Sequence, residues 1–356
     1  MFARRFSHRF LTRKSSKDLP SATIISEKVP LPPKTSNQDI KRVIEDFLLA
    51  IEYRPRYTQP NDALRQFLNA EIKSWNVPVD QKLLTKLTQS AAVLAETSYG
   101  HLPQPYLHYA ALYSCFFFYA DDFAEKNPDR IKEFPLRFLR GQGQDDPVLD
   151  KYAEHLRNAY TMFPQVAANM IVSGSLEFLT ATYIETTTKD LKLSSHATPY
   201  PWFLRSRSGV GVVYGHMAFP KSDTYDFKSY IQLAPEFEKL VSLSKFVPAL
   251  FLPHPLIHID RSPPSLSDVL SFYKEALAGE TNSFLMNRAA IENKDPLVVL
   301  REIAAESAAN IRRIVDIASE QGDEVRKLAL NFAYGYIEFH MLTPRYRLEE
   351  LGIKAQ

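Results

Sequence analysis

The sequence predicts an all-α protein that folds as one domain behind an irregular N-terminal segment. Apolar residues recur at helical spacing, as Ile40, Val43, Ile44 and Phe47 do, and clear alternating strands bounded by tight turns are absent. Of the 356 residues, 45% are hydrophobic, which is enough for a large core, and only 11 are glycine, which argues against a Gly-rich β protein. No repeat and no composition break interrupts the chain after residue 40.

The first 37 residues are predicted to be a disordered basic and proline-rich tail, and residues 38–356 the all-α domain. The basic residues of positions 1–17, where no acid occurs, are Arg4, Arg5, Arg9, Arg13, Lys14 and Lys17. We interpret this segment as the tail of a cytoplasmic protein. A mitochondrial leader is the alternative, because such leaders are also rich in arginine and poor in acids.

The spacing of apolar residues predicts the helices in order along the domain. Pro103 and Pro105 mark the entry to the fourth, which is dense in aromatic residues. The predicted helices cover residues 38–51, 63–75, 79–97, 106–125, 146–160, 164–185, 201–218, 229–245, 266–293, 296–321 and 323–342.

Composition excludes several classes of partner. A net charge of +2 gives no case for a nucleic-acid partner. Cys115 is the only cysteine, so neither a disulfide framework nor a thiolate metal site can form within one chain. The most apolar run, residues 109–120, is too short to cross a bilayer, so no stable membrane insertion is expected. The oligomeric state stays open, with a homodimer as one option.

The aromatic helix over 106–125 ends in a group of acids. Asp121 and Glu125 lie about 40° apart on a helical wheel, and Asp122 lies near the edge of the same face. Their mutual repulsion, and their place at a helix C-terminus, are unfavourable unless a cation binds. Tyr113 and Phe117 precede Asp121 by two turns and one turn. Acids at the mouth of an aromatic channel suit a ligand with an apolar tail and a diphosphate head; an acidic surface turn is the alternative.

A second polar group lies on the helix that begins at residue 266. Ser267, Ser271 and Glu275 fall within about 80° of one another, with Lys274 on the same arc. Hydroxyl and carboxylate oxygens suit Mg²⁺, and a nearby lysine suits a phosphate bound to that ion. The alternative is the solvated face of an amphipathic helix.

Three segments together resemble a known family. Residues 268–275, Asp-Val-Leu-Ser-Phe-Tyr-Lys-Glu, look like the NDxxSFYKE element of the trichodiene synthase family of fungal sesquiterpene cyclases. Residues 200–205, Tyr-Pro-Trp-Phe-Leu-Arg, followed by Ser208 and Gly209, resemble its pyrophosphate-sensing segment, and residues 345–348, Arg-Tyr-Arg-Leu, resemble its C-terminal element. With the acids at 121–125, these elements occur in the family's order, and the resemblance covers roughly residues 90–351.

This resemblance implies a class I terpene synthase bundle around a central apolar active-site cavity, with three Mg²⁺ ions and farnesyl diphosphate as the substrate. It implies Asp121 as the main ligand of the first metal motif, supported by Asp122 and Glu125. The second motif would use Ser271 and Glu275, with Ser267 at the position of the family's asparagine. It implies diphosphate binding by Arg205, Lys274, Arg345 and Tyr346, with Arg205 as the sensor that Ser208 and Gly209 link to the reacting end of the substrate.

Two departures from the family pattern bear on metal affinity and product. Ser267 offers a hydroxyl where an amide oxygen is expected, and Asp268, about 20° from Glu275 on the wheel, could compensate. Which of the two ligates metal stays open. Glu125 replaces the final aspartate of the first motif. The alternatives to a cyclase are a chain-elongating prenyltransferase and a non-catalytic isoprenoid-diphosphate-binding protein, and the product skeleton cannot be inferred from the sequence.

Overall fold

A computed structural model describes residues 36–56, 59–77, 81–189, 191, 194, 196–197, 199–208, 210–242, 266–278 and 283–353. The predicted tail therefore lies outside the described residues except for its last two positions. Every regular element described is helical, which confirms the all-α prediction. Within the described residues, no helix combines the length and apolar character needed to cross a bilayer.

The regular elements in the described part of the chain are α-helices and short 3-10 helices. In order they are α1 (Asn37–Ala50), α2 (Asp62–Ser74), α3 (Gln81–Tyr99), α4 (Gln104–Ala124), α5 (Pro128–Leu139), α6 (Pro147–Met162), α7 (Gln165–Thr187), α8 (Tyr200–Ser208), α9 (Gly211–Met217), α10 (Phe227–Tyr230), η1 (Ile231–Leu233), α11 (Ala234–Ser242), α12 (Leu266–Ala278), α13 (Phe284–Glu292), α14 (Pro296–Glu320), α15 (Asp323–Leu342), η2 (Pro344–Tyr346) and η3 (Leu348–Leu351).

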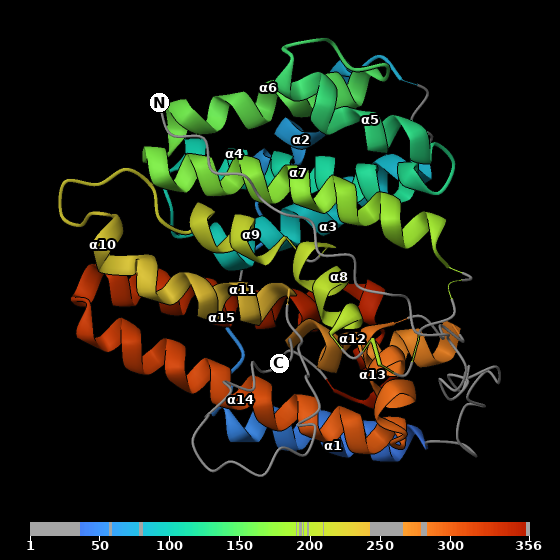
Figure 1. Ribbon diagram of the computed structural model, residues 1–356. Helices are drawn as coiled ribbons and strands as arrows, with labels where there is room; N and C mark the ends of the chain where they lie inside the picture. Colours follow the sequence, from blue (N-terminus) through green and yellow to red (C-terminus); the bar gives the residue numbers. More distant parts are fainter. Residues whose placement is uncertain are drawn as a thin grey trace, which may run out of the picture.

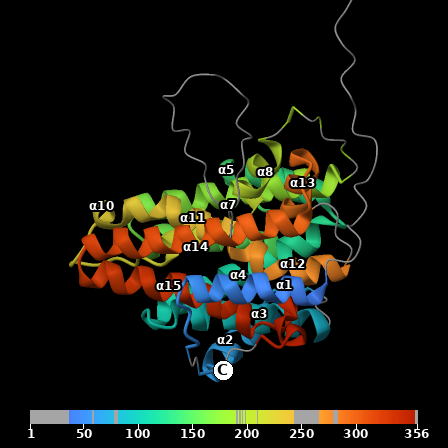
Figure 2. The same cartoon turned by 90° about the horizontal axis from the view of Figure 1, so that it is seen from below.

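The long helices form a layered bundle. Helix α3 packs against both α4 and α15, and α9 packs against both α7 and α11 (Figure 1). Helices α8, α12 and α13 gather at one end of the bundle, and α10 lies at the opposite end in both views (Figures 1 and 2). Helix α13 contacts both α8 and α12. This end of the bundle thus brings together the helices that carry Arg205 and Ser271.

Close approach of helices depends on glycines at two crossings. A side-chain carbon at Gly335 of α15 would lie 2.1 Å from the carbonyl oxygen of Thr97 in α3. One at Gly174 of α7 would lie 2.5 Å from a methyl carbon of Val212 in α9. Both distances are shorter than van der Waals contact, so the layers can approach this closely only where a side chain is missing.

The structure corrects three helix predictions. The predicted helix over 201–218 is divided into α8 and α9, because Val210 adopts a left-handed conformation with φ of 49°. The predicted helix over 266–293 is two helices, α12 and α13, and the one over 229–245 begins earlier, as α10, η1 and α11. Residues 243–245 lie outside the described residues.

Helix α5 was not predicted. Pro128 stands at its first position, where the missing N–H has no partner to lose, and Ile131 and Phe134 are buried at helical spacing. Pro135 lies inside the helix, where a proline normally breaks the pattern. The buried apolar pair therefore outweighs the local cost of this proline.

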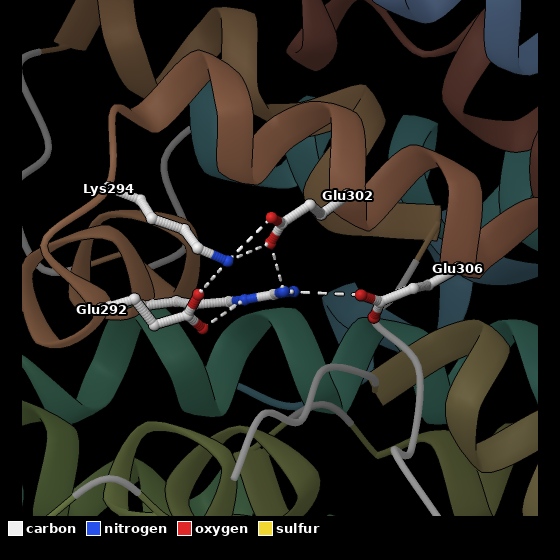
Figure 3. Close-up of polar contacts among 5 residues, drawn as sticks. Glu292, Lys294, Glu302 and Glu306 are labelled. Atoms are coloured by element: carbon white, nitrogen blue, oxygen red, sulfur yellow. Dashed lines mark hydrogen bonds and ion pairs between the residues drawn. The ribbon is translucent and has the colours of Figure 1, made fainter. Parts of the chain in front are cut away.

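A group of five charged residues joins α13 to α14 (Figure 3). Arg288 is almost fully buried, and its guanidinium donates to Glu292 at 2.8 Å, to Glu302 at 2.7 Å and to Glu306 at 3.4 Å. Lys294 donates to Glu302 at 2.7 Å and contacts Glu292 at 2.8 Å. Three carboxylates face two cations, and burial raises the pKa of Glu306 to about 7.

We expect Arg288→Met to lower the free energy of unfolding by about 3 kcal/mol or more, because carboxylates would remain buried without their main partner. Lys151→Met is the control. It removes a lysine from an exposed ion pair with Glu154 on α6, and should cost less than about 1 kcal/mol. Urea unfolding followed by circular dichroism measures both. Equal losses in the two variants would contradict a structural role for the group.

Candidate functional site

The acids predicted as the first metal motif lie at the C-terminal end of α4, as the sequence indicates. Asp122 forms an ion pair with Lys86 of α3 at 2.5 Å. Glu125, the residue after the helix, forms one with Lys189, which follows α7, at 2.5 Å. These two acids therefore reach toward different neighbouring helices. Asp121 precedes both of them in the sequence and is half-buried.

A fourth acid, Glu185, belongs to this region and was not predicted. It lies in the last turn of α7 and is partly buried. Burial raises the pKa of Glu185 to about 7, and the charge of Asp121 adds to this effect, while the Ser208 hydroxyl and the charge of Arg205 act in the opposite direction. Four helix-borne side chains from α4, α7 and α8 are therefore electrostatic neighbours. The sequence offers only a weak signal for Glu185, a single acid at the end of an apolar helix.

The two arginines of α8 have different surroundings. The guanidinium of Arg207 lies 4.2 Å from the centre of the Phe203 ring and donates to the Phe203 carbonyl at 3.0 Å. Arg205 instead influences the pKa values of Glu185 and of His340 in α15. Because α8 ends at Ser208, Arg205 stands in its last turn, beside the break before α9. Gly209, the other predicted residue of this break, lies outside the described residues.

Helix α12 carries the predicted second metal motif. Ser271 is buried, and Val269 and Phe272 pack into the core, as the helical pattern predicts. Lys274 is half-buried on the same helix. The hydroxyl of the adjacent Tyr273 donates to Glu350 of η3 at 3.2 Å, which ties α12 to the C-terminal segment.

Four predicted ligands cannot be placed as side chains. The helix α12 includes positions 267, 268 and 275, but the side chains of Ser267, Asp268 and Glu275 lie outside the described part, and so does that of Arg345. Among the side chains that the structure describes, no group of three or more His, Cys, Asp or Glu is arranged to hold a metal ion. The assignment of metal ligands therefore stays a prediction.

The C-terminal turn η2 places Tyr346 against α15. The Tyr346 ring lies 4.4 Å from the ring of His340 and 5.8 Å from that of Phe339, measured between centres. Arg347, the next residue, is exposed and donates to Glu350 at 2.6 Å, so it does not share the surroundings of Tyr346. Since His340 is an electrostatic neighbour of Arg205, this turn lies close to the end of α8.

The aromatic residues before the α4 acids are mostly core. Tyr113 is fully buried, and its hydroxyl forms a hydrogen bond with Ser175 of α7 at 3.0 Å. Phe117 is only partly buried, and its ring lies 4.7 Å from that of Phe178 and 6.2 Å from that of Tyr214. Phe117 is thus the better candidate of the two for contact with an apolar ligand.

Comparisons with known proteins identify the family and the fold of the chain. The family model for trichodiene synthase (TRI5) matches residues 53–356. An alpha-cuprenene synthase of Coprinopsis cinerea is 29% identical over 321 residues, which cover 88% of this chain and 90% of that protein. Terpene synthase BipA of Cochliobolus sativus is 32% identical over 241 residues, or 67% of each chain. The crystal structure of a linalool/nerolidol synthase from Streptomyces clavuligerus has the same fold, with a TM-score of 0.57 and 10% identity, over 82% of this chain and 98% of that one.

Stability should depend on pH through Glu185. Between its ordinary pKa of 4.5 and its raised pKa of about 7, the folded state keeps a proton that the unfolded state releases, so this group lowers stability as pH rises. We expect the melting temperature of Glu185→Gln, relative to the unchanged protein, to increase from about pH 5 to about pH 8. Glu177→Gln, at an exposed position on the same helix, is the control and should show a constant difference. A constant difference for Glu185→Gln as well would show that its carboxyl is not buried as described.

Proposed function

The chain belongs to the trichodiene synthase family of terpene cyclases, and from this premise we propose that it converts farnesyl diphosphate to a cyclised sesquiterpene with the aid of Mg²⁺. The observation that carries the proposal is the meeting of Asp121, Glu185 and Arg205 at the end of the bundle where α8, α12 and α13 also gather. Carboxylates beside a guanidinium suit a ligand that is both anionic and bound to cations.

The oxygen donors fit Mg²⁺. Asp121, supported by Asp122 and Glu125, would hold metal on α4, and Ser271 with Glu275 would hold it on α12. Carboxylate and hydroxyl oxygens are the ligands that this hard ion prefers, and no soft sulfur ligand lies among the residues proposed. When bound, Mg²⁺ supplies neutralisation of the charge that develops on the departing diphosphate.

Cationic and hydroxyl side chains would bind the diphosphate itself. We assign this role to Arg205, Lys274, Arg345 and Tyr346, which come from α8, α12 and η2. Charge-assisted hydrogen bonds from these groups would strengthen as the bond between the allylic carbon and oxygen breaks and its electron pair passes to the diphosphate. Ser208, beside Arg205 at the end of α8, would link this binding to the reacting end of the substrate, together with Gly209.

The apolar part of the substrate needs surroundings that exclude water, because water would quench an allylic cation. Phe117 lies one turn before Asp121 on α4 and is partly buried among other aromatic rings. An aromatic face attracts a cation by up to about 2 kcal/mol when desolvated. Cyclisation would end by loss of a proton or capture of one water molecule.

Incubation with farnesyl diphosphate and Mg²⁺, followed by analysis of the volatile extract, tests the proposal. We expect a cyclised hydrocarbon or alcohol, and no product after removal of Mg²⁺ with a chelator. A longer diphosphate, formed when isopentenyl diphosphate is added, would identify a prenyltransferase. Unchanged substrate would identify a non-catalytic binding protein.

Substitution of the proposed ligands gives a second test. We expect Asp121→Asn and Glu275→Gln each to lower turnover by about a hundredfold or more, because each removes a charge that the leaving group requires. Glu154→Gln, on the exposed face of α6, serves as the control and should keep full turnover. Full turnover by Asp121→Asn would overturn the assignment of the first metal motif.

A further inference from the structure

His340 is a fully buried residue near the C-terminal end of α15, and neither the sequence elements nor the proposed mechanism gives it a role. Its ring lies among three aromatic rings, with centres 4.7 Å from Tyr336, 5.1 Å from Phe339 and 4.4 Å from Tyr346. Tyr346 is the only one of the three that belongs to the C-terminal turn and to the predicted diphosphate site. His340 therefore packs against Tyr346, a residue of the proposed diphosphate site.

The protonation of His340 follows from its contacts. Nδ1 lies 2.8 Å from the carbonyl oxygen of Tyr336, which can only accept, so Nδ1 carries the hydrogen and Nε2 presents a lone pair. Nε2 is buried and has no hydrogen-bond partner among the described residues. Burial and the charge of Arg205 lower the pKa of His340 to about 4, while the hydrogen bond to Tyr336 acts in the opposite direction. The ring is thus neutral at physiological pH.

A neutral ring has two consequences at this place. The His340 ring lies between α15 and the C-terminal turn, in contact with the Tyr346 ring at an interplanar angle of 35°, and its hydrogen bond to the Tyr336 carbonyl fixes the orientation of the imidazole. The neutral imidazole also adds no positive charge beside Arg205, so His340 does not repel the Arg205 guanidinium.

We propose that His340 is a positioning residue for diphosphate binding, which holds Tyr346 of the C-terminal turn close to Arg205 so that both can bind one anion. The inference rests on the proposed function, because it assumes that Tyr346 and Arg205 share a diphosphate. His340 itself touches no reacting atom. It acts through Tyr346.

The test compares His340 with His155, a second buried histidine whose Nε2 also lacks a hydrogen-bond partner among the described residues. The His155 ring lies 4.0 Å from that of Tyr109, inside the core of α4 and α6 and away from the C-terminal turn. His340→Leu and His155→Leu each replace a buried imidazole by an aliphatic side chain of similar size, so their structural costs are matched. His340→Phe restores a flat ring against Tyr346.

Binding is measured with inorganic diphosphate and Mg²⁺ by calorimetry and by the rise in melting temperature, and turnover with farnesyl diphosphate. We expect His340→Leu to weaken diphosphate binding about tenfold, which corresponds to about 1.4 kcal/mol, and His155→Leu to leave it unchanged. His340→Phe should recover most of the affinity. If His340→Leu does not fold, His340→Phe is compared with His155→Phe instead. We then expect His340→Phe to bind diphosphate more weakly than His155→Phe, by less than the tenfold expected for His340→Leu.

A double-substitution cycle shows whether His340 acts through Tyr346. We expect His340→Leu to weaken binding little further once Tyr346→Ala has been made, because the supported ring is then absent. Independent, additive losses, or equal binding by His340→Leu and His155→Leu, would overturn the inference while leaving the proposed function intact. Failure of the unchanged protein both to bind Mg²⁺–diphosphate and to convert farnesyl diphosphate would overturn the proposed function, and the inference with it.

Discussion

The arrangement of the candidate site depends on one partly buried carboxyl group. Glu185 lies where the ends of α4, α7 and α8 meet, and its neighbours are an acid, a hydroxyl and a guanidinium. A carboxyl in such a place is costly to ionise, because burial removes its hydration, and the charge of Arg205 offsets part of this cost. The position of Arg205 is therefore coupled to α7 as well as to the helix that bears it.

The interruption between α8 and α9 determines where Arg205 and Ser208 stand. A continuous helix from 201 to 218 would carry both within its middle, surrounded by intrahelical hydrogen bonds. The left-handed conformation of Val210 instead ends α8 at Ser208 and leaves the last carbonyl groups of α8 outside the ladder of the next helix. A β-branched residue seldom adopts this conformation, so tertiary contacts of the buried Val210 side chain must stabilise it.

The fold class and most helix positions could be predicted because burial imposes a 3.6-residue period on the sequence, and Ile40, Val43, Ile44 and Phe47 of α1 are all buried as expected. The break at Val210 could not, since valine gives no local signal for it. The roles of Glu185 and His340 also escaped prediction, because they arise from contacts between segments far apart in the chain. The Arg288 group contains both a contact within one helix and contacts between two helices. Its pair with Glu292 has helical spacing, whereas Glu302 and Glu306 come from the next helix.

The ion pairs of the α4 acids have a consequence for the thermodynamics of metal loading. The ammonium groups of Lys86 and Lys189 serve as counterions for Asp122 and Glu125, so a divalent ion bound there as proposed would have to displace them. Each pair is partly exposed to solvent and contributes about 0.2–1 kcal/mol, so displacing it weakens metal affinity by a factor of only a few. The same lysines would pair with the carboxylates again once such an ion had dissociated.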